Sequence, residues 1–367
     1  MAEALKHMYN PDFFERLCPV LRSSIPGFDC KYFIHRIFNN EWPDLELKQR
    51  VRHIAVTLHD FLPADFPEAA DILVRLSEQL RENEIHEQGF ATIFIPQYIQ
   101  VYGLDHPTVS LNALEKITQL VSAEFAIRPF ILQYRELAFE KLNAWCKHQN
   151  ANVRRLSSEG CRPRLPWAMG IPALKKDPTP ILPILDCLKD DPSEYVRRSV
   201  ANNLNDIAKD HPQLVLEIAR KWQGRSPDTD RIIKHGCRTL LKKGNSDVLG
   251  LHGFNPNSRG DLKSLELGKP KVKIGEYLYF SFAFVNREKK LTPFRLEYSI
   301  DYLTSTGKRS NKMFKITENE FDAGKTVTIA RKQSFKNLTT RRHFKGKHTL
   351  TIFSNGRKIG AKEFMVC

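Results

Sequence analysis

Three carboxylates and one tryptophan are the residues of this sequence with the strongest claim to a chemical role. Glu124 lies in SAEFAIRPF, Glu159 in RRLSSEGCRPRLPWA and Asp206 in ANNLNDIAKD. A carboxylate can stabilise a positive charge and position a water molecule, and an indole such as that of Trp167 can stack on a planar group or attract a cation. We therefore take these four as the candidate catalytic residues.

Two of these carboxylates also have an ordinary structural explanation. Glu124 has Arg128 four residues later, and Glu159 has Arg155 four residues earlier, so each could form an ion pair on a helix surface. Glu159 stands out because the basic stretch CRPRLPWAMGIP follows it. Trp167 in that stretch could anchor two repeats in a core, but the basic residues around it favour an exposed stacking role.

Familiar sites of other enzyme classes are missing from the sequence. It contains no Walker A loop, no dinucleotide GxGxxG, no HExxH and no GxSxG nucleophile elbow. Its histidines occur singly rather than in metal-ligand spacing. We therefore expect no covalent, metal-dependent or nucleotide-dependent chemistry, and no cofactor.

Two similar stretches contain the elements that would position these residues. NVRRLSSEGCRPRLPWAMGIP and YVRRSVANNLNDIAKDHP place their Val-Arg-Arg triplets 43 residues apart, a period typical of HEAT-like helical repeats. The second copy has helical spacing of its apolar residues, which are Val196, Val200, Leu204, Ile207 and Ala208. Its other side carries Arg198, Asn202 and Asp206. The 43-residue offset aligns Arg155 with Arg198 and Glu159 with Asn202.

Stacked repeats of this kind would line one surface with arginines, amides and carboxylates. We expect this surface and a basic run near the C-terminus to bind a polyanionic partner through Arg154, Arg155, Arg162, Arg164, Arg197, Arg198, Asn202, Asn203, Lys209, Arg341, Arg342 and Lys345. Some of these arginines could instead pair with Asp190, Asp191 or Glu194 between repeats.

The net charge of +15 is unevenly distributed along the chain. Residues 1–150 hold 15 basic and 20 acidic side chains, residues 151–260 hold 19 and 12, and residues 261–367 hold 23 and 10. A basic middle and a strongly basic end favour a polyanionic partner, nucleic acid before membrane. The alternative is a solvated face that only keeps the protein soluble.

The rest of the composition indicates a cytoplasmic protein. No run approaches the roughly 18 apolar residues of a membrane helix, and the N-terminus reads as an amphipathic start rather than a secretory signal. The 7 cysteines are scattered and include no CxxC pair. We therefore expect reduced thiols, with neither a disulfide framework nor a zinc site.

The first 250 residues have the apolar periodicity of helices. Helices are predicted over 45–62 and 70–84, and Pro96 argues for a short buried helix rather than a strand in 90–104. Three consecutive helices are predicted within 106–160. Further helices are predicted over Pro180–Lys189, Ser193–Lys209, Pro212–Trp222 and Thr229–Lys243.

After a glycine-rich stretch the pattern alternates as in strands. Strand-like segments cover 277–286, 294–303, 312–317, 326–335, 348–355 and 358–366, and Asn355-Gly356 is a hairpin signal. The predicted fold class is thus multidomain, α plus β: an α-solenoid of HEAT-like repeats (1–250), a linker (251–268) and a small immunoglobulin-like β-sandwich (269–367).

Three segments carry a resemblance to a known family. SAEFAIRPF (122–130), NVRRLSSEGCRPRLPWAMGIP (152–172) and YVRRSVANNLNDIAKDHP (195–212) resemble the AlkC branch of the AlkC/AlkD family of HEAT-like-repeat DNA glycosylases. The resemblance is specific over 105–245 and weaker upstream. The C-terminal part resembles the immunoglobulin-like domain that some AlkC-type members append.

The resemblance implies a monofunctional glycosylase of base excision repair acting on alkylated double-stranded DNA. The expected substrates are N-alkylated bases, 3-methyladenine first and 3-methylcytosine as a further candidate, processed without the usual flipping of the base. Glu124, Glu159 and Asp206 would stabilise an oxocarbenium-like sugar and position water, and Trp167 would attract the cationic base or sugar. We expect a monomer that has no membrane partner.

The main rival is a non-catalytic HEAT-repeat scaffold that binds nucleic acid or protein. Such a scaffold needs no acidic residue inside a basic groove. The two hypotheses differ in whether Glu124, Glu159, Asp206 and Trp167 converge on one surface.

Overall fold

The computed structural model describes residues 5–82, 90–338 and 341–367, and it divides into two compact units. The first unit comprises Met1–Asp210 and Gly224–Gly236, and the second comprises His211–Gln223 and Cys237–Cys367. The elements of the first unit are η1 (Leu5–Met8), α1 (Pro11–Ser24), α2 (Cys30–Ile37), η2 (Trp42–Asp44), α3 (Leu47–His59), α4 (Phe66–Glu82), α5 (Phe94–Tyr102), α6 (Pro107–Ile117), α7 (Arg128–Gln133), α8 (Arg135–Trp145), α9 (Ala151–Glu159), α10 (Pro172–Lys176), η4 (Thr179–Ile181), α11 (Leu182–Leu188), α12 (Glu194–Ile207) and α14 (Pro227–Gly236).

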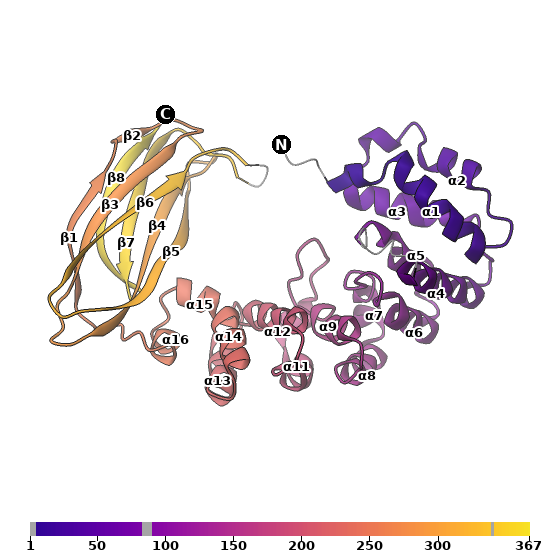
Figure 1. Cartoon of the computed structure of the whole chain (residues 1–367), viewed down its shortest axis with the longest axis horizontal. Helices are drawn as coiled ribbons and strands as arrows, with labels where there is room; N and C mark the ends of the chain where they lie inside the picture. Colours follow the sequence, from indigo (N-terminus) through magenta and orange to yellow (C-terminus); the bar gives the residue numbers. More distant parts are fainter. Residues whose placement is uncertain (1–4, 83–89, 339–340) are drawn as a thin grey trace. The chain divides into compact units, whose positions relative to one another are not determined.

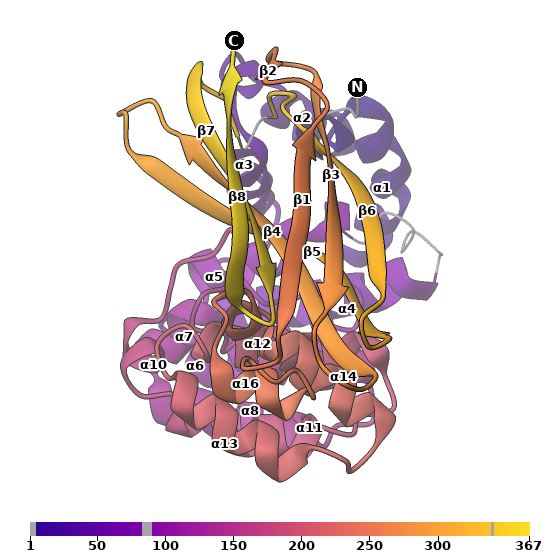
Figure 2. The ribbon, with the colours of Figure 1, turned by 90° about the vertical axis from the view of Figure 1, so that its left-hand side faces the viewer.

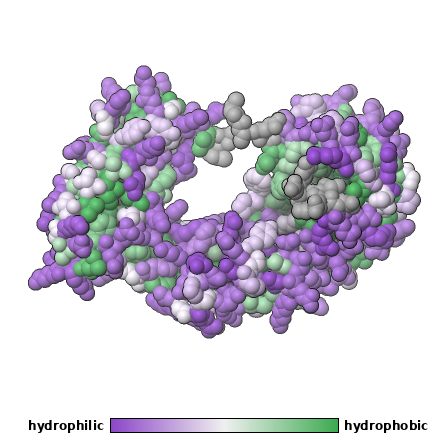
Figure 3. Space-filling view, in the orientation of Figure 1, coloured by the Kyte–Doolittle hydropathy of each residue, from purple (hydrophilic) through white to green (hydrophobic). Residues whose placement is uncertain are grey.

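The helices of the first unit stack in two layers, as the resemblance to HEAT-like repeats predicted. Helices α4, α6, α8 and α11 contact one another in sequence to form one layer, and α9, α12 and α14 pack side by side in the other (Figure 1). The predicted apolar face of α12 is confirmed, because Val196 and Val200 are fully buried and Leu204 and Ile207 nearly so. The surface over α6, α8 and α11 is mostly hydrophilic (Figure 3).

Local sequence signals explain most helix boundaries in this unit. The side chain of Asn150 accepts a hydrogen bond from the backbone N–H of Asn152 and caps α9. The predicted short helix in 90–104 is confirmed as α5. Four helices, α6 to α9, occupy the stretch in which three were predicted, because Tyr134 has a non-helical backbone and separates α7 from α8.

The predicted helix over Thr229–Lys243 is two helices. Cys237 leaves the helical conformation with φ −83° and ψ 1°, so α14 ends at Gly236 and α15 (Arg238–Lys242) begins after it. The last residues of the helix predicted over 70–84 lie outside the described residues. No helix in the described part of the chain is long and apolar enough to cross a membrane.

Cys18 and Cys30 form a disulfide, contrary to the expectation of reduced thiols throughout. Their Cα atoms are 5.9 Å apart, within disulfide range. Helices α1 and α2 contact each other and bring the two sulfur atoms together. The sequence offered no spacing signature for this pair, since only the packing of the two helices makes them neighbours.

The second unit contains three helices and a β-sandwich. Its elements are α13 (Pro212–Trp222), α15, α16 (Ser246–Leu251), β1 (Gly260–Leu267), β2 (Lys271–Val272), β3 (Tyr277–Asn286), β4 (Thr292–Leu303), β5 (Arg309–Phe321), β6 (Thr326–Ser334), β7 (Gly346–Ser354) and β8 (Arg357–Val366). One sheet has the order β1-β3-β6 and the other β2-β8-β7-β4-β5 (Figure 2). All pairs are antiparallel except β2 with β8.

The sandwich agrees with the strand pattern of the sequence except at its start. Phenylalanines and aliphatic residues of both sheets form its core, and Asn355-Gly356 makes the β7–β8 turn with φ of 46° and 78°. Strand β1, however, lies inside the stretch 251–268 that was expected to be a linker. A bulge between Leu262 and Ser264 interrupts the alternation of β1, which explains why its pattern was not recognised.

Two histidines are buried near one end of the sandwich core. His343 is 6% exposed and His348 is fully buried, and the ring of Phe335 lies 4.9 Å and 5.9 Å from theirs. Burial lowers the pKa of both imidazoles, and the charge of Arg341 lowers that of His343 further. The carbonyl of Phe344 opposes this effect at His348.

We expect the sandwich to lose stability in mild acid. A histidine whose pKa is lower in the folded state stabilises the fold fully above the unfolded pKa of about 6.5, and this contribution is lost as the pH falls below that value. Hydrogen exchange of β4 and β7, corrected for intrinsic rates, should show weaker protection at about pH 5.5 than at about pH 8. The double variant His343→Asn with His348→Asn should show a smaller difference; an unchanged difference would contradict this explanation.

Candidate active site

The three candidate carboxylates belong to one chain of ion pairs. Arg155 Nη1 lies 2.7 Å from Glu124 Oε2, and Arg155 Nη2 lies 3.6 Å from Glu159 Oε1. Arg162 Nη1 lies 2.6 Å from Glu159 Oε1, and Arg162 Nε lies 2.9 Å from Asp206 Oδ2. Two arginines thus join Glu124, which precedes α7, to Glu159 on α9 and Asp206 on α12.

Burial makes this network electrostatically strong. Glu159 is 4% exposed and Asp206 is 1% exposed. Burial by itself would lower the pKa of Arg155 and Arg162, but the neighbouring carboxylates outweigh it and raise the pKa of both guanidinium groups. Both arginines therefore stay charged.

One oxygen of this network remains unused. Glu159 Oε2 is buried and has no hydrogen-bond partner among the residues that the structure describes. Its companion Oε1 receives both arginines, so Oε2 is the oxygen that can accept a proton or face a positive charge. A buried carboxylate oxygen without a partner is uncommon in folded proteins and is a feature typical of functional sites.

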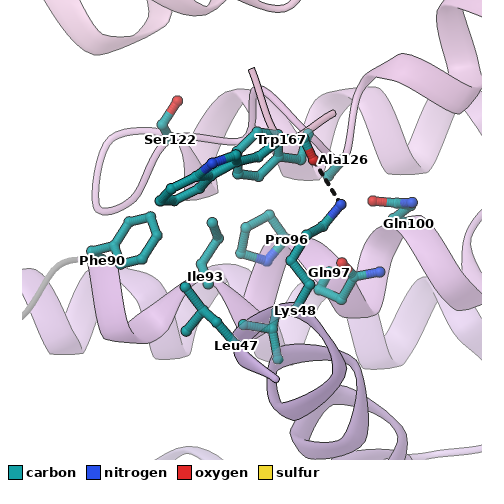
Figure 4. A pocket seen from close by; sticks show the side chains of 12 residues that line it. Leu47, Lys48, Phe90, Ile93, Pro96, Gln97, Gln100, Ser122, Ala126 and Trp167 are labelled. Carbon is teal, nitrogen blue, oxygen red and sulfur yellow. Dashed lines mark hydrogen bonds between the residues drawn. The ribbon is translucent and has the colours of Figure 1, made fainter. Parts of the chain in front are cut away.

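Trp167 lies beside this network on an exposed loop. Its side chain is 60% exposed, its φ is +64°, and its carbonyl accepts a hydrogen bond from Lys48 Nζ at 2.7 Å. The indole lies over a small apolar pocket formed with residues that include Phe90, Ile93 and Pro96 (Figure 4). The cavity volume is about 30 Å³, which is space for a single water molecule.

Ser122 connects this pocket to the carboxylates. It lines the pocket opposite α3 and α5, and its hydroxyl donates to Glu124 Oε2 at 2.8 Å. It also accepts a hydrogen bond from Arg155 Nη1 at 2.9 Å. Ser122 therefore links the pocket under Trp167 to Glu124, the more accessible end of the ion-pair chain, whereas Glu159 and Asp206 lie buried behind it.

Arg128 holds the loop that carries Trp167, a role that the sequence analysis missed. Its guanidinium is fully buried and donates to the carbonyls of Gly160, Arg162 and Met169 at 2.7 to 2.9 Å. The sequence spacing had suggested a surface pair with Glu124. Burial lowers the pKa of Arg128 to about 10, so the side chain still carries its charge at neutral pH.

The first arginine of each Val-Arg-Arg triplet serves the repeat itself. Arg154 Nη1 donates to the carbonyls of residues 148 and 149, and Arg197 Nη1 donates to those of residues 191 and 192, the equivalent positions 43 residues later. Arg154 also pairs with Asp191, and Arg197 pairs with Asp228. The sequence analysis left open whether these arginines bind DNA or pair between repeats, and the structure shows Arg154 and Arg197 paired between repeats.

Two of the expected DNA-binding residues lie inside the protein. Arg162 is 6% exposed and is saturated by Glu159 and Asp206. Asn203 is fully buried, and its amide donates to the carbonyl of Ser158. Both side chains face neighbouring helices because the repeats stack, so this placement argues against a contact with phosphate.

The remaining candidates are at the surface. Arg198 is exposed and makes no hydrogen bond or ion pair within the described residues. It lines a groove between α12 and α14 with a volume of about 400 Å³, together with Arg197, Arg231 and His235. Asn202 contacts His235, Lys209 pairs with Asp206, and Arg164 pairs with Asp210.

Tyr195 is another residue that the sequence analysis missed. Its ring is 45% exposed and lies 4.3 Å from the guanidinium carbon of Arg155. The sequence signal for Tyr195 was its position directly before a Val-Arg-Arg triplet, where an aromatic ring can contact an arginine. In the sandwich, Arg342 and Lys345 are exposed, whereas Arg341 lies 5.3 Å from the ring of Tyr302.

Burial predicts very different costs for two arginines that are two residues apart in sequence. Arg162→Ala should lower the free energy of unfolding by about 3–5 kcal/mol, because it removes the buried cation that two buried carboxylates share. Arg164→Ala removes an exposed pair with Asp210 and should cost at most about 1 kcal/mol. Urea unfolding followed by circular dichroism of the helices measures both. Similar losses for the two variants would contradict the structural role of Arg162.

Comparison with known proteins covers the whole chain. Residues 261–367 match a family model described as the C-terminal immunoglobulin-like domain of the uncharacterised protein YhaZ. The chain is 45% identical over 364 residues to the uncharacterized protein YhaZ of Bacillus subtilis, covering 99% of both sequences. It is also similar to the solved structure of the Pseudomonas fluorescens alkylpurine DNA glycosylase AlkC bound to DNA containing an abasic site analog. That match has a TM-score of 0.93, 35% identity and 100% coverage of both chains.

Proposed function

The chain belongs to the AlkC-type family of HEAT-like-repeat DNA glycosylases with a C-terminal immunoglobulin-like domain, and we propose that it is an alkylpurine DNA glycosylase. In this role it hydrolyses the N-glycosidic bond of N-alkylated bases in duplex DNA, with 3-methyladenine as the first substrate and 3-methylcytosine as a further candidate. It is monofunctional and leaves an abasic site.

The observation that carries the proposal is the joining of three carboxylates by two arginines beside an exposed indole. Glu124, Glu159 and Asp206 come from separate elements, yet Arg155 and Arg162 connect all three. A scaffold that only binds a partner has no need for this convergence, which supports the enzyme over the scaffold. The two arginines offset the desolvation cost of placing carboxylates in a partly buried site.

The chemistry suits a base that already carries a positive charge. The electron pair of the C1′–N bond moves to the alkylated base, which leaves neutral, and the sugar becomes oxocarbenium-like. Water then adds to C1′ and gives its proton to a carboxylate. Glu159 Oε2 is the acceptor that we propose, because no described residue uses it and both arginines hold the opposite oxygen. This oxygen is buried in the protein without DNA, so the mechanism requires that DNA binding opens a path for water to it.

The small volume beside Trp167 supports excision without base flipping. The cavity volume of about 30 Å³ is small, so the pocket has no deep enclosed space for an extruded base. The indole is exposed and its edge is near Ser122, so it can meet a cationic base or sugar that stays in the DNA (Figure 4). Arg128 keeps this loop in place through three backbone carbonyls.

Phosphate contacts fall to the cationic side chains that remain exposed. In the first unit these are Arg198 and Lys209, and the partly exposed Arg164 and the neutral amide of Asn202 are further candidates. Arg342 and Lys345 are the exposed cations of the basic run in the sandwich, and we include them in the DNA-binding set. Arg155 is assigned to positioning Glu124 and Glu159 rather than to phosphate.

Removing one carboxylate charge should slow base release without abolishing DNA binding. Glu124→Gln and Glu159→Gln keep the shape of the side chain, and each should reduce single-turnover release of bases from methylated duplex DNA by about a hundredfold or more. The released bases are identified by chromatography, and the DNA strand should remain uncleaved at the abasic site. Affinity for the duplex should change little.

Glu136→Gln is the matched control for this experiment. Glu136 is exposed on α8 in the other helix layer and takes no part in the network. Its rate should equal that of the unaltered protein. Unchanged release in both Glu124→Gln and Glu159→Gln would exclude the carboxylate mechanism, and no release from any methylated duplex would exclude the glycosylase.

Salt dependence separates phosphate contacts from structural arginines. Each phosphate contact contributes about one unit to the slope of log affinity against log salt concentration. Arg198→Ala, Arg342→Ala and Lys345→Ala should each reduce the slope by about one unit, because these side chains are exposed. Arg154→Ala is the control and should leave the slope unchanged, since Arg154 is already paired with Asp191. If the slope is unchanged in Arg198→Ala, Arg198 does not bind phosphate and leaves the DNA-binding set.

A further inference from the structure

The outer face of the sheet β1-β3-β6 carries small residues at its centre. The strand register places Ser281 opposite Ala330 and Glu266, and Ala283 opposite Thr328 and Ser264, so that these side chains share one face. Phe280, Phe282 and Phe284 alternate with them and point into the core. In Figure 2 the three strands lie side by side at the front of the sandwich. This face offers backbone and short side chains to a partner.

Two exposed tyrosines project from one end of this face. Tyr277 is 45% exposed and Tyr279 is 58% exposed, and they alternate in β3 with the buried Leu278 and Phe280. Their ring centroids are 6.2 Å apart with the planes tilted by 48°. Neither ring contributes to the core, so core packing does not account for two neighbouring aromatic residues on the surface.

Lysines surround the two tyrosines. Lys332 Nζ lies 4.9 Å from the centre of the Tyr277 ring, and Lys332 is opposite Tyr279 in the β3–β6 register. Lys269 and Lys271 line a hollow of about 570 Å³ with both tyrosines. Lys263 on β1 reaches Thr326 on β6 with its Nζ, so it crosses the same face.

The carboxylates on this face are fewer. Glu266 and Asp261 project from β1, and Asp261 is paired with Arg287. Glu276 lines the hollow, and four lysines, Lys263, Lys269, Lys271 and Lys332, outnumber these carboxylates. The whole C-terminal segment 261–367 has 23 basic and 10 acidic side chains. The face is therefore positive and aromatic rather than simply apolar.

We infer that this face binds single-stranded nucleic acid. Tyr277 and Tyr279 stack on unpaired bases, while Lys269, Lys271 and Lys332 bind the phosphates between them. Exposed aromatic rings on a sheet beside cationic side chains are the two features that single-strand recognition requires. Bases paired in a duplex keep their faces stacked on each other, so the rings select an unpaired strand. The site is separate from the carboxylate network and requires neither an alkylated base nor excision.

The test measures binding of the full-length protein to a short fluorescent oligothymidylate by anisotropy. The double variant Tyr277→Ser with Tyr279→Ser should weaken this binding by about tenfold or more, because stacking on each base contributes strongly to affinity. Tyr277→Phe with Tyr279→Phe keeps both rings and should stay within about twofold of the unaltered protein. Lys271→Gln and Lys332→Gln should each lower the salt slope by about 0.7 units.

Two controls make the result decisive. Leu291→Ser changes a residue of the same unit that is 51% exposed, and it should leave the affinity unchanged. Circular dichroism and hydrogen exchange of β3 show whether the serine variant is folded. If the serine variant is unfolded, the variants Lys271→Gln and Lys332→Gln still test the site. Equal oligothymidylate affinity in the serine variant and the unaltered protein overturns the inference. Equally strong competition by polyglutamate also overturns it, because the face would then recognise charge alone.

Discussion

The charge balance of a buried carboxylate–arginine network is the constraint on which the first unit depends. Glu159 and Asp206 are almost inaccessible to water, and an isolated charge at such a depth would be very costly. Arg162 lies between them and Arg155 extends the pairing to Glu124. The ion pairs of the network form only while the helices that carry its members stay in register. The electrostatics of the site therefore depend on how the helices stack.

Arginine has three distinct uses in these repeats. The first arginine of each Val-Arg-Arg triplet binds two carbonyls of the turn before its own helix, which closes the repeat. The second arginine projects differently in the two copies: Arg155 is committed to carboxylates, whereas Arg198 is exposed on α12. Arg128 holds the Trp167 loop through a hydrogen bond to the carbonyl of Met169. A high arginine content in such a repeat protein therefore overstates the number of cations that are free to meet DNA.

The sequence analysis succeeded wherever local periodicity carried the information. The apolar face of α12, the short helix α5 and the β7–β8 turn follow from spacing and residue type within a dozen residues. It failed where irregular backbone or long-range packing decided the outcome. The bulge in β1 interrupts the alternation, so this strand was predicted to be a linker. Tyr134 and Cys237 divide helices that were predicted to be continuous. The Cys18–Cys30 disulfide depends on how α1 packs on α2.

The sequence by itself determined the helical repeat period, the change to alternating strands, the basic C-terminal part and the residue types available for chemistry, because each is a property of neighbouring residues. Only the tertiary structure decided which of those residues act together. Arg155 and Glu124 are 31 positions apart, Arg162 and Asp206 are 44 apart, and Arg154 and Asp191 are 37 apart. Separations close to one repeat become contacts only when the repeats stack. Coulomb attraction and burial both act on distance in space, so the assignment of each arginine to structure or to surface could not be made from spacing along the chain.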